Sequence, residues 1–414
     1  MKISNINSLL TDSTNKRSCI CTVLPAAILL CTIFFMGSSF VSTNYNERLS
    51  RLAVTDSVPA TVVEKCNNGC LPSGSGALPK GIVSRTSNLE MQPLWGSPKK
   101  KRNTKSLLAL AVGIKQKENV DKIVKKFPSS DFTVMLFHYD GVVDNWRDLQ
   151  WSNSALHVSA INQTKWWFAK RFLHPDIVDE YDYIFLWDED LGVEHFNPVR
   201  YLSIVKEEGL EISQPALDTR SIVHHPITAR GSRSRVHRRM YKYSGGGRCY
   251  ENSTAPPCTG WVEMMAPVFS RAAWRCAWYM VQNDLIHAWG LDMKLGYCAQ
   301  GDRSKNVGVV DAEYVFHQGI ATLGASDKNK TSEEAPGTGS PPRSPSDKRT
   351  RTPVPKELPA NNDRLAVPSE HSQNDPRSLI RLRSHYEMEM FYQRWNDAVE
   401  GDECWTDPYK KLEP

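Results

Sequence analysis

The alternation of apolar and polar segments between residues 105 and 190 is typical of an α/β domain. Residues 106–114 (SLLALAVGI) and 132–139 (FTVMLFHY) are short continuous apolar runs, as expected of strands that are buried on both faces. The segment between them has apolar residues at i, i+3, i+4 and i+7, the spacing of one helical face: Val120, Ile123, Val124 and Phe127. The pattern therefore predicts a strand, a helix and a second strand in succession.

The same alternation continues as far as an acidic turn. Residues 155–161 predict a third, short strand, and a helical stripe follows that ends at His174-Pro175. Residues 183–187 (YIFLW) form another apolar run, which leads directly into Asp188-Glu189-Asp190. Because strands that alternate with helices favour βαβ units, we expect one Rossmann-like domain with a mostly parallel sheet.

The pattern is less regular in the second half of this region. Residues 224–257 are rich in Gly, Arg and Ser and predict long loops, whereas 260–269 predict a strand. Ser270 is in position to be the N-cap of a helix, and the apolar residues after it have helical spacing: Trp274, Ala277, Trp278, Val281 and Leu285. Two short strands, 307–310 and 314–316, complete the predicted domain.

Residues 19–41 predict a transmembrane signal anchor. The apolar run spans roughly 33 Å at the α-helical rise of about 1.5 Å per residue, which matches the core of a bilayer. Lys16 and Arg17 precede it, so residues 1–18 are expected to be a cytosolic tail and the rest of the chain lumenal, a type II arrangement. The alternative is a signal peptide cleaved at Gly37-Ser38-Ser39, but the apolar run is longer than such peptides need.

The remaining segments follow from composition. Residues 42–104 are rich in Ser, Asn, Gly and Pro and predict a stem, and 105–325 hold the α/β domain. Residues 326–378 are rich in Pro, Ser and charge and predict a disordered segment, and 379–414 predict a C-terminal helix and tail. We expect this helix to be amphipathic, anchored by Leu379, Leu382, Tyr386, Met390 and Trp395.

Charge and cysteine content narrow the class of protein. A net charge of +5 over 414 residues is mild and predicts no nucleic-acid partner. The ten cysteines include no CxxC pair, and Cys249 and Cys258 flank a short loop, where a disulfide is plausible in an oxidising compartment. N-glycosylation sequons at Asn162, Asn252 and Asn329 modestly support a secretory route.

The acidic turn is the strongest chemical signal in the chain. In an open parallel sheet, ligands bind outside the carboxyl ends of the strands, so the strand at 183–187 would deliver Asp188 and Asp190 to that edge. Two neighbouring carboxylates repel each other, and a hard divalent cation relieves the repulsion. We therefore predict that Asp188 and Asp190 hold Mn²⁺ or Mg²⁺ against a diphosphate. The alternative is a plain acidic turn.

Several long stretches support a family resemblance over residues 105–325, among them KSLLALAVGIKQK, YDYIFLWDEDLGVEHFNP and HAWGLDMKLGYCAQG. They identify the chain as similar to a plant-rich family built on domain of unknown function 707, sometimes labelled lysine-ketoglutarate reductase trans-splicing related. Its architecture resembles the GT-A class of glycosyltransferases. That resemblance implies a single GT-A-like domain in which an Asp-x-Asp metal site binds a nucleotide-sugar donor.

The resemblance also suggests partners for the metal site. Many GT-A enzymes complete the metal shell with a late histidine, and His317 is placed accordingly. They often place a catalytic carboxylate at the start of a helix, which makes Asp292 the candidate base that takes the acceptor's proton. The alternatives are an ordinary hydrogen-bonded histidine and a helix N-cap.

Other polar residues have two interpretations each. Glu263 lies inside an apolar run and either faces the acceptor or points to solvent, and Trp261 beside it either stacks on a sugar or packs in the core. Asp140 either holds the nucleotide, as Asp188 would, or serves the Asp-Gly turn. The arginines between Arg230 and Arg239 either grip an anionic ligand or form a solvated loop.

These features support a hypothesis of a Golgi glycosyltransferase. It would be a single-pass type II membrane protein whose lumenal domain uses a nucleotide-sugar donor and a glycan or polysaccharide acceptor. The alternative is a non-catalytic lumenal scaffold or carbohydrate-binding protein of the same fold. A nuclear RNA-associated role, as the family label suggests, conflicts with the apolar segment at 19–41 and with the absence of an RNA-binding motif.

Overall fold

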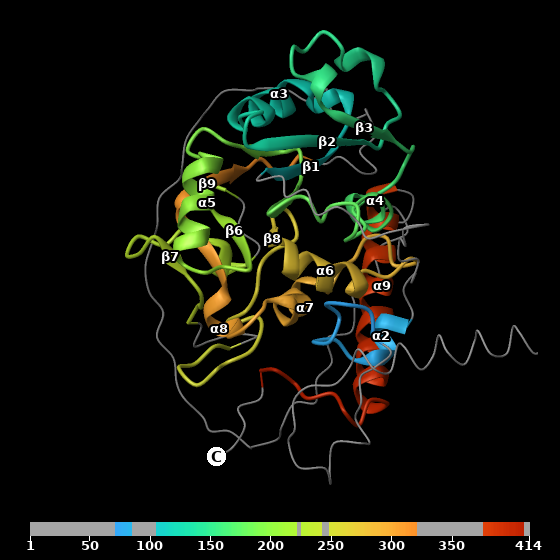
Figure 1. Ribbon diagram of the computed structural model, residues 1–414, viewed down its shortest axis with the longest axis vertical. Helices are drawn as coiled ribbons and strands as arrows, with labels where there is room; N and C mark the ends of the chain where they lie inside the picture. Colours follow the sequence, from blue (N-terminus) through green and yellow to red (C-terminus); the bar gives the residue numbers. More distant parts are fainter. Residues whose placement is uncertain (1–70, 85–104, 222–224, 242–247, 321–375, 410–414) are drawn as a thin grey trace, which may run out of the picture. The chain divides into compact units, whose positions relative to one another are not determined.

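The computed structural model describes residues 71–84, 105–221, 225–241, 248–320 and 376–409 (Figure 1). Nine strands form in these residues: β1 (Ser106–Val112), β2 (Phe132–His138), β3 (Leu156–Ser159), β4 (Tyr183–Trp187), β5 (Leu191–Gly192), β6 (Ile212–Leu217), β7 (Val236–His237), β8 (Val268–Ser270) and β9 (Val307–His317). Their order is β3-β2-β1-β4-β8-β6-β9-β5, and β7 pairs with β9.

The sheet is mixed but mostly parallel, as the sequence predicts. The strands β3, β2, β1 and β4 pair in parallel. β8 is antiparallel to both β4 and β6, so β6 runs in the direction of β4, and β9 is parallel to β6. Six strands therefore place their carboxyl ends at one edge of the sheet, where a ligand is expected in folds of this kind.

Helices cover both faces of the sheet. On one face α3 (Lys117–Lys126) and α5 (Pro198–Glu207) pack over Leu108 and Leu110, and on the other α4 (Lys165–Phe172) and α6 (Arg271–Met280) pack over Leu107 and Ala109. Successive residues of β1 thus enter opposite cores, because side chains alternate along a strand. This double burial explains why the strand appears in the sequence as an unbroken apolar run.

Polar side chains begin the helices where the sequence suggests. Ser270 accepts a hydrogen bond from the Ala273 N–H at 3.1 Å and so begins α6, as predicted. Asn197 likewise caps α5, with Pro198 at the first helical position. The prediction missed α5 and β6, although the Asn-Pro pair was a readable signal for the helix.

Three predicted boundaries are wrong. Residues 260–267 do not form a strand: the N–H of Glu263 bonds the side chain of Gln214, and the Met264 carbonyl bonds the Lys165 ammonium, instead of a neighbouring strand. The helix after Ser270 ends at Met280 rather than near residue 285. The two last strands are one strand, β9, opposite a register irregularity in β6.

Two segments far apart in the chain pack together at the side of the domain. Figure 1 shows α2 (Lys80–Ser84) beside α9 (Pro376–Glu400). Ile82 is fully buried there, so this part of the predicted stem belongs to the packed domain. The C-terminal helix is present, but its predicted anchoring face is partly wrong: Trp395 is buried, whereas three other proposed anchors are more than half exposed, namely Leu379, Leu382 and Tyr386.

The predicted anchor at 19–41 and the predicted disordered segment lie outside the described residues, except that α9 begins at Pro376. Within the described ranges, no helix has the length and apolar character needed to cross a bilayer.

Candidate functional site

The acidic turn lies at the carboxyl edge of the sheet, and β9 brings His317 to it. The Nε2 atom of His317 lies 3.3 Å from Oδ2 of Asp190, and both side chains are largely buried. The same carboxylate oxygen accepts a hydrogen bond from the Ile320 N–H at 3.0 Å. The Ser221 hydroxyl, from the loop after β6, accepts a bond from the His317 N–H. The antiparallel pairing of β5 with β9, in which Leu191 lies opposite His317, thus assembles a pair that is 127 residues apart in sequence.

Asp188 faces a different partner. Its carboxylate lies 2.8 Å from the ammonium of Lys165, the first residue of α4, while 40% of its own side-chain area stays exposed. The ammonium also donates hydrogen bonds to the carbonyls of Met264 (2.6 Å) and Met265 (3.3 Å). Partial burial raises the pKa of Asp188, Lys165 opposes this shift, and repulsion from Asp190 adds to it. Lys165 therefore ties the acidic turn to the segment before β8, a role that the sequence did not suggest.

The middle residue of the turn has a structural role. Glu189 is buried and accepts hydrogen bonds from the Gly113 N–H at 2.7 Å and from the Tyr139 hydroxyl. Burial raises its pKa to about 8. A side chain at Gly113 would meet the Tyr139 hydroxyl at 2.5 Å, so the close approach requires glycine. Glu189 thus joins the ends of β1, β2 and β4 into one edge.

Asp140 has both carboxylate oxygens engaged by backbone. One accepts from the Ile114 N–H at 2.6 Å and the other from the Val142 N–H at 3.0 Å. This geometry favours the turn interpretation, because the side chain already holds the loops after β1 and β2. Asp140 still lies at the same edge as Asp188, two strands away.

Glu263 lies within electrostatic reach of His317, Asp188 and Asp292. Burial raises the pKa of Glu263 to about 7; His317 lowers it, and the carboxylates of Asp292 and Asp188 raise it further. One oxygen of Glu263 is buried without a hydrogen-bond partner among the described residues. Asp292 begins α7 (Asp292–Leu295), and burial raises its pKa to about 6. The two carboxylates thus take up protons near neutral pH, as a general base requires.

The donor set fits a small divalent cation of the predicted kind. Asp190 offers a carboxylate oxygen and His317 an imidazole nitrogen at close range, and Mn²⁺ accepts both. Among the described residues no group of three His, Cys, Asp or Glu side chains is arranged to hold a metal. A cation at this pair would therefore take its other ligands from phosphate oxygens and water, as Mg²⁺ and Mn²⁺ commonly do beside phosphates.

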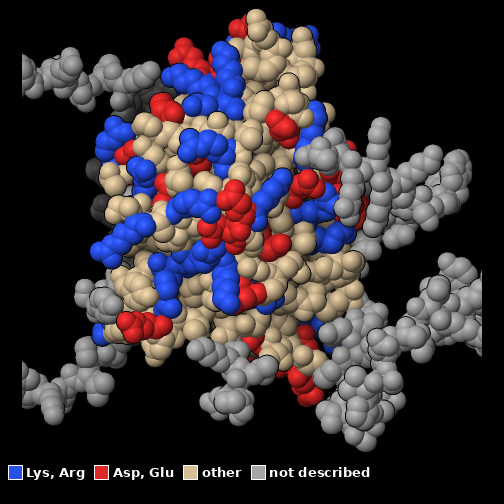
Figure 2. Space-filling model, turned by 60° about the vertical axis from the view of Figure 1, so that its left-hand side comes forward, with Lys and Arg blue, Asp and Glu red and all other residues tan. Residues whose placement is uncertain are grey.

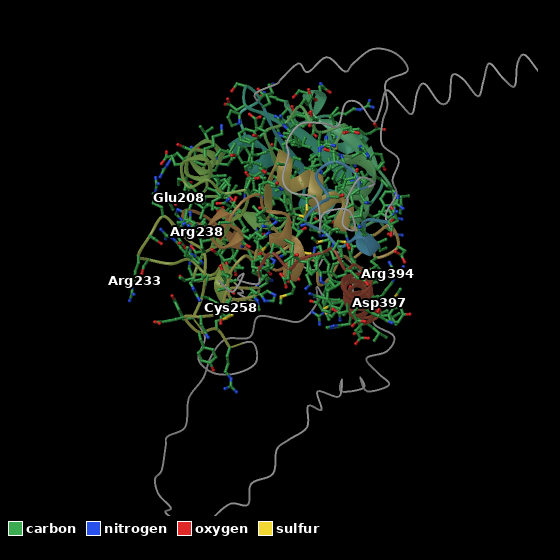
Figure 3. The ribbon with its side chains drawn as sticks, turned by 60° about the horizontal axis from the view of Figure 1, so that its bottom comes forward. Glu208, Arg233, Arg238, Cys258, Arg394 and Asp397 are labelled. Carbon is green, nitrogen blue, oxygen red and sulfur yellow. A yellow bond between two sulfur atoms is a disulfide. The ribbon has the colours of Figure 1, made fainter. Side chains whose placement is uncertain are left out.

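Trp261 and the arginine run have ordinary structural roles. Trp261 is 1% exposed and is therefore a core residue rather than a sugar platform. Arg235 and Arg238 form ion pairs with acidic residues at the end of α5, and Figure 3 shows Arg238 beside Glu208. On this side of the molecule, basic and acidic side chains are interspersed (Figure 2), so no patch of a single sign forms there.

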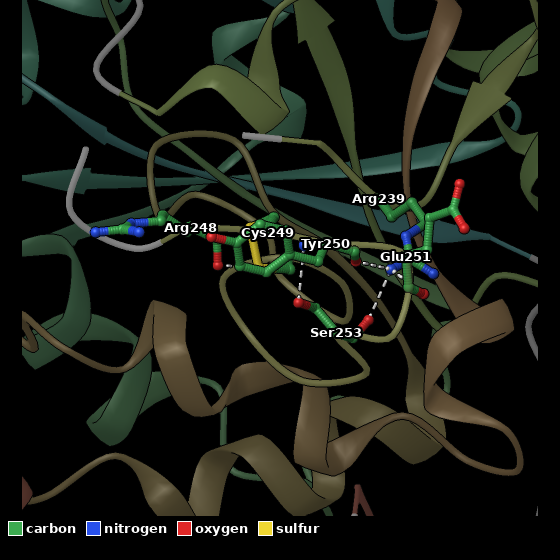
Figure 4. Close-up of a disulfide and its surroundings, with 7 residues drawn as sticks. Arg239, Arg248, Cys249, Tyr250, Glu251 and Ser253 are labelled. Atoms are coloured by element: carbon green, nitrogen blue, oxygen red, sulfur yellow. Dashed lines mark hydrogen bonds between the residues drawn. A yellow bond between two sulfur atoms is a disulfide. The ribbon is translucent and has the colours of Figure 1, made fainter. Parts of the chain in front are cut away.

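Disulfides stabilise the loops around the site. The Cys249–Cys258 bond expected from the sequence is present, and Arg239 donates to three carbonyls of its loop (Figure 4). A second bond, Cys276–Cys298, joins α6 to the residues after α7, and Cys404 is also disulfide-bonded. The sequon residues Asn162 and Asn252 are exposed, and Asn329 lies outside the described residues.

The chain belongs to a family described as a protein of unknown function (DUF707), whose model matches residues 69–401. This confirms the resemblance identified from the sequence. No curated protein sequence matches the chain.

The fold is distantly similar to solved glycosyltransferases. S. aureus TarS 1–349 is 9% identical with a TM-score of 0.31, and the match covers 51% of this chain and 59% of that one. The structure of TarS 1–349 in complex with UDP is 8% identical with a TM-score of 0.33, and the match covers the same 51% and 59% of the two chains. The glycosyltransferase GlyE of Streptococcus pneumoniae TIGR4 is 13% identical with a TM-score of 0.27, and the match covers 50% of this chain and 46% of GlyE. The chain thus spans about half of each of these proteins.

Proposed function

We propose that this member of the DUF707 family is a metal-dependent glycosyltransferase with a nucleotide-sugar donor. The proposal rests above all on one juxtaposition: the Asp190–His317 pair lies at the carboxyl edge of the sheet, Glu263 is within electrostatic reach of His317, and Asp292 is within reach of Glu263. Metal ligands and a proton acceptor in one site are what transfer from a nucleotide diphosphate to a hydroxyl requires.

Each residue has a defined task in this mechanism. Asp190 and His317 would hold Mn²⁺ or Mg²⁺, which supplies charge stabilisation for the diphosphate leaving group. Asp188, partly exposed beside Lys165, would face the donor. Glu263 or Asp292 accepts the proton of the attacking acceptor hydroxyl. Glu263 is the better candidate where the pH is above 7, since it then carries a charge with an unpartnered oxygen.

We further propose that the domain works in the lumen of the Golgi, anchored by residues 19–41. All five cysteines of the described residues are disulfide-bonded. Such bonds form and persist in oxidising compartments, which supports a lumenal domain.

Binding and turnover by the full-length protein in detergent test the transferase. We expect UDP or GDP to raise the melting temperature only when Mn²⁺ is present, and we expect slow donor hydrolysis. Asp190→Asn should abolish both effects, whereas Asp182→Asn, a change at an ion pair with Arg271 just before the amino end of β4, should leave them intact.

Two results would remove the metal from the mechanism. One is equal donor turnover by the wild type and by Asp190→Ala, and the other is a nucleotide effect that does not depend on Mn²⁺. No thermal shift with any nucleotide would favour the non-catalytic carbohydrate-binding alternative.

A further inference from the structure

The C-terminal helix holds the segment that leads to Asp292. Glu387 of α9 accepts a hydrogen bond from the His287 N–H at 2.8 Å, and its other oxygen lies 3.1 Å from the His287 ring. A Cβ atom on Gly290 would lie 3.0 Å from side-chain atoms of Met388 and Tyr392. The helix therefore contacts the backbone of this segment closely, although about 100 residues separate the two in sequence.

The backbone of the segment is held in an uncommon conformation. Ala288 has φ of +59° and Gly290 has φ of +88°. The left-handed region is unfavourable for alanine and persists where surrounding contacts impose it, which occurs most often at functional sites. Here α9 supplies those contacts.

This conformation presents one tryptophan to solvent. Trp289 is 36% exposed, which makes it the most exposed tryptophan among the described residues, and its ring packs edge-on against His385 of α9 at 4.9 Å. A bulky aromatic ring that is fixed on one side and open on the other offers its free face to the apolar face of a ligand.

The position of Trp289 relates it to Asp292, one of the two candidate bases. Trp289 lies against His385, and Tyr392, further along the same helix, is close enough to Asp292 for that carboxylate to raise its pKa. Seven residues of helix separate His385 from Tyr392, a distance of roughly 10 Å at about 1.5 Å per residue. Trp289 and Asp292, which are three residues apart in sequence, thus both lie close to α9.

We propose that Trp289 is an acceptor subsite, on which a sugar ring of a neutral glycan stacks near Asp292. The proposal rests on the proposed transferase function and names its acceptor class. Sugars with equatorial hydroxyls present flat C–H faces, which pack on an indole, while their hydroxyls stay in water.

Direct binding tests this assignment without turnover. The probes are cellotetraose, xylotetraose, mannotetraose and β-1,4-galactotetraose, added to the full-length protein in detergent and followed by isothermal titration calorimetry. We expect at least one of them to bind, and Trp289→Ala to weaken it about tenfold. Trp289→Phe, which keeps a ring, should weaken it less. Tyr250→Ala, which removes an exposed aromatic from the disulfide loop, should leave binding unchanged.

The outcomes separate this proposal from the transferase. Donor hydrolysis in the absence of acceptor should be equal in the wild type and Trp289→Ala, since water replaces the glycan. Failure of all four tetrasaccharides to bind, or equal binding by Trp289→Ala, would overturn the acceptor subsite and leave the exposed ring to a protein partner. Tetrasaccharide binding that depends on Trp289, in a protein with no nucleotide response, would keep the subsite and overturn the transferase.

Discussion

Lys165 is the residue whose removal most directly tests the electrostatics of the acidic turn. Its side chain is 7% exposed, and its ammonium contacts Asp188 and the carbonyls of Met264 and Met265. The variant Lys165→Met keeps an unbranched apolar stem and removes the charge and the donors. It therefore isolates the ammonium from the packing of the side chain.

The structure sets the size of the effect on stability. The Met264 carbonyl loses a charged donor at 2.6 Å, which costs about 1.5–3 kcal/mol. The Met265 carbonyl keeps the Asp188 N–H as a donor, so it adds little. The ion pair contributes about 1 kcal/mol or less, since Asp188 is 40% exposed and water screens it. We expect Lys165→Met to lose about 2–4 kcal/mol of unfolding free energy.

The same variant should bind Mn²⁺ more tightly. Lys165 competes with a cation for Asp188, so its removal frees a carboxylate next to Asp190; we expect about tenfold higher affinity. Urea unfolding measures the first effect, and calorimetric titration of the folded variant with MnCl₂ measures the second. Lys117→Met is the control, because it removes a comparable but more exposed ion pair at Asp148 and should change neither quantity much.

The distinctive result for Lys165→Met is that the free energy of unfolding falls while the affinity for Mn²⁺ rises. If the folded Lys165→Met protein binds Mn²⁺ with unchanged or lower affinity, Lys165 does not compete with a cation at Asp188. If its stability falls no more than that of Lys117→Met, the ammonium does not support the turn.

Three further changes have predictable results. Folding raises the pKa of Glu263 from 4.5 to about 7, so the carboxylate ionises at lower pH in the unfolded chain and the free energy of unfolding falls as the pH rises between these values. Glu263→Gln should remove up to about 3 kcal/mol of this loss. Urea unfolding at pH 4.5 and at pH 8 measures it. Gly296→Ala would place a Cβ atom 1.9 Å from a backbone oxygen and should cost about 3 kcal/mol, whereas Gly76→Ala, with nothing within 4 Å, should be neutral; a similar melting temperature for the two would contradict this packing. Cys276→Ser removes the disulfide to Cys298, which closes a loop of 22 residues, and should lower the free energy of unfolding by about 3 kcal/mol under oxidising conditions. Once both proteins are reduced, their free energies of unfolding should not differ.

The candidate site was only partly predictable. A strand that ends in Asp-x-Asp is a local pattern, so Asp188 and Asp190 were visible in the sequence, and His317 and Asp292 followed from a family resemblance. The role of Lys165 was not predictable, because this residue reaches Asp188 from a helix that begins 23 residues earlier. Nothing in the sequence around Lys165 indicates that it is part of the site. The sequence left Trp261 open between a sugar platform and a core position, because burial of a tryptophan depends on packing and not on its neighbours in sequence; the structure buries Trp261 and exposes Trp289.

The sequence by itself determined the α/β character of the domain. Strands buried on both faces need continuous apolar runs, and helices that cover a sheet need one apolar stripe. The local sequence therefore predicts β1, β2, β4, α3 and α6. Only the tertiary structure decided the order of the strands, the return of β9 beside the acidic turn and the packing of α9 against residues 287–290. These depend on contacts between residues from about 60 to more than 100 positions apart, whose energies come from burial and complementary shape and leave no periodic trace along the chain.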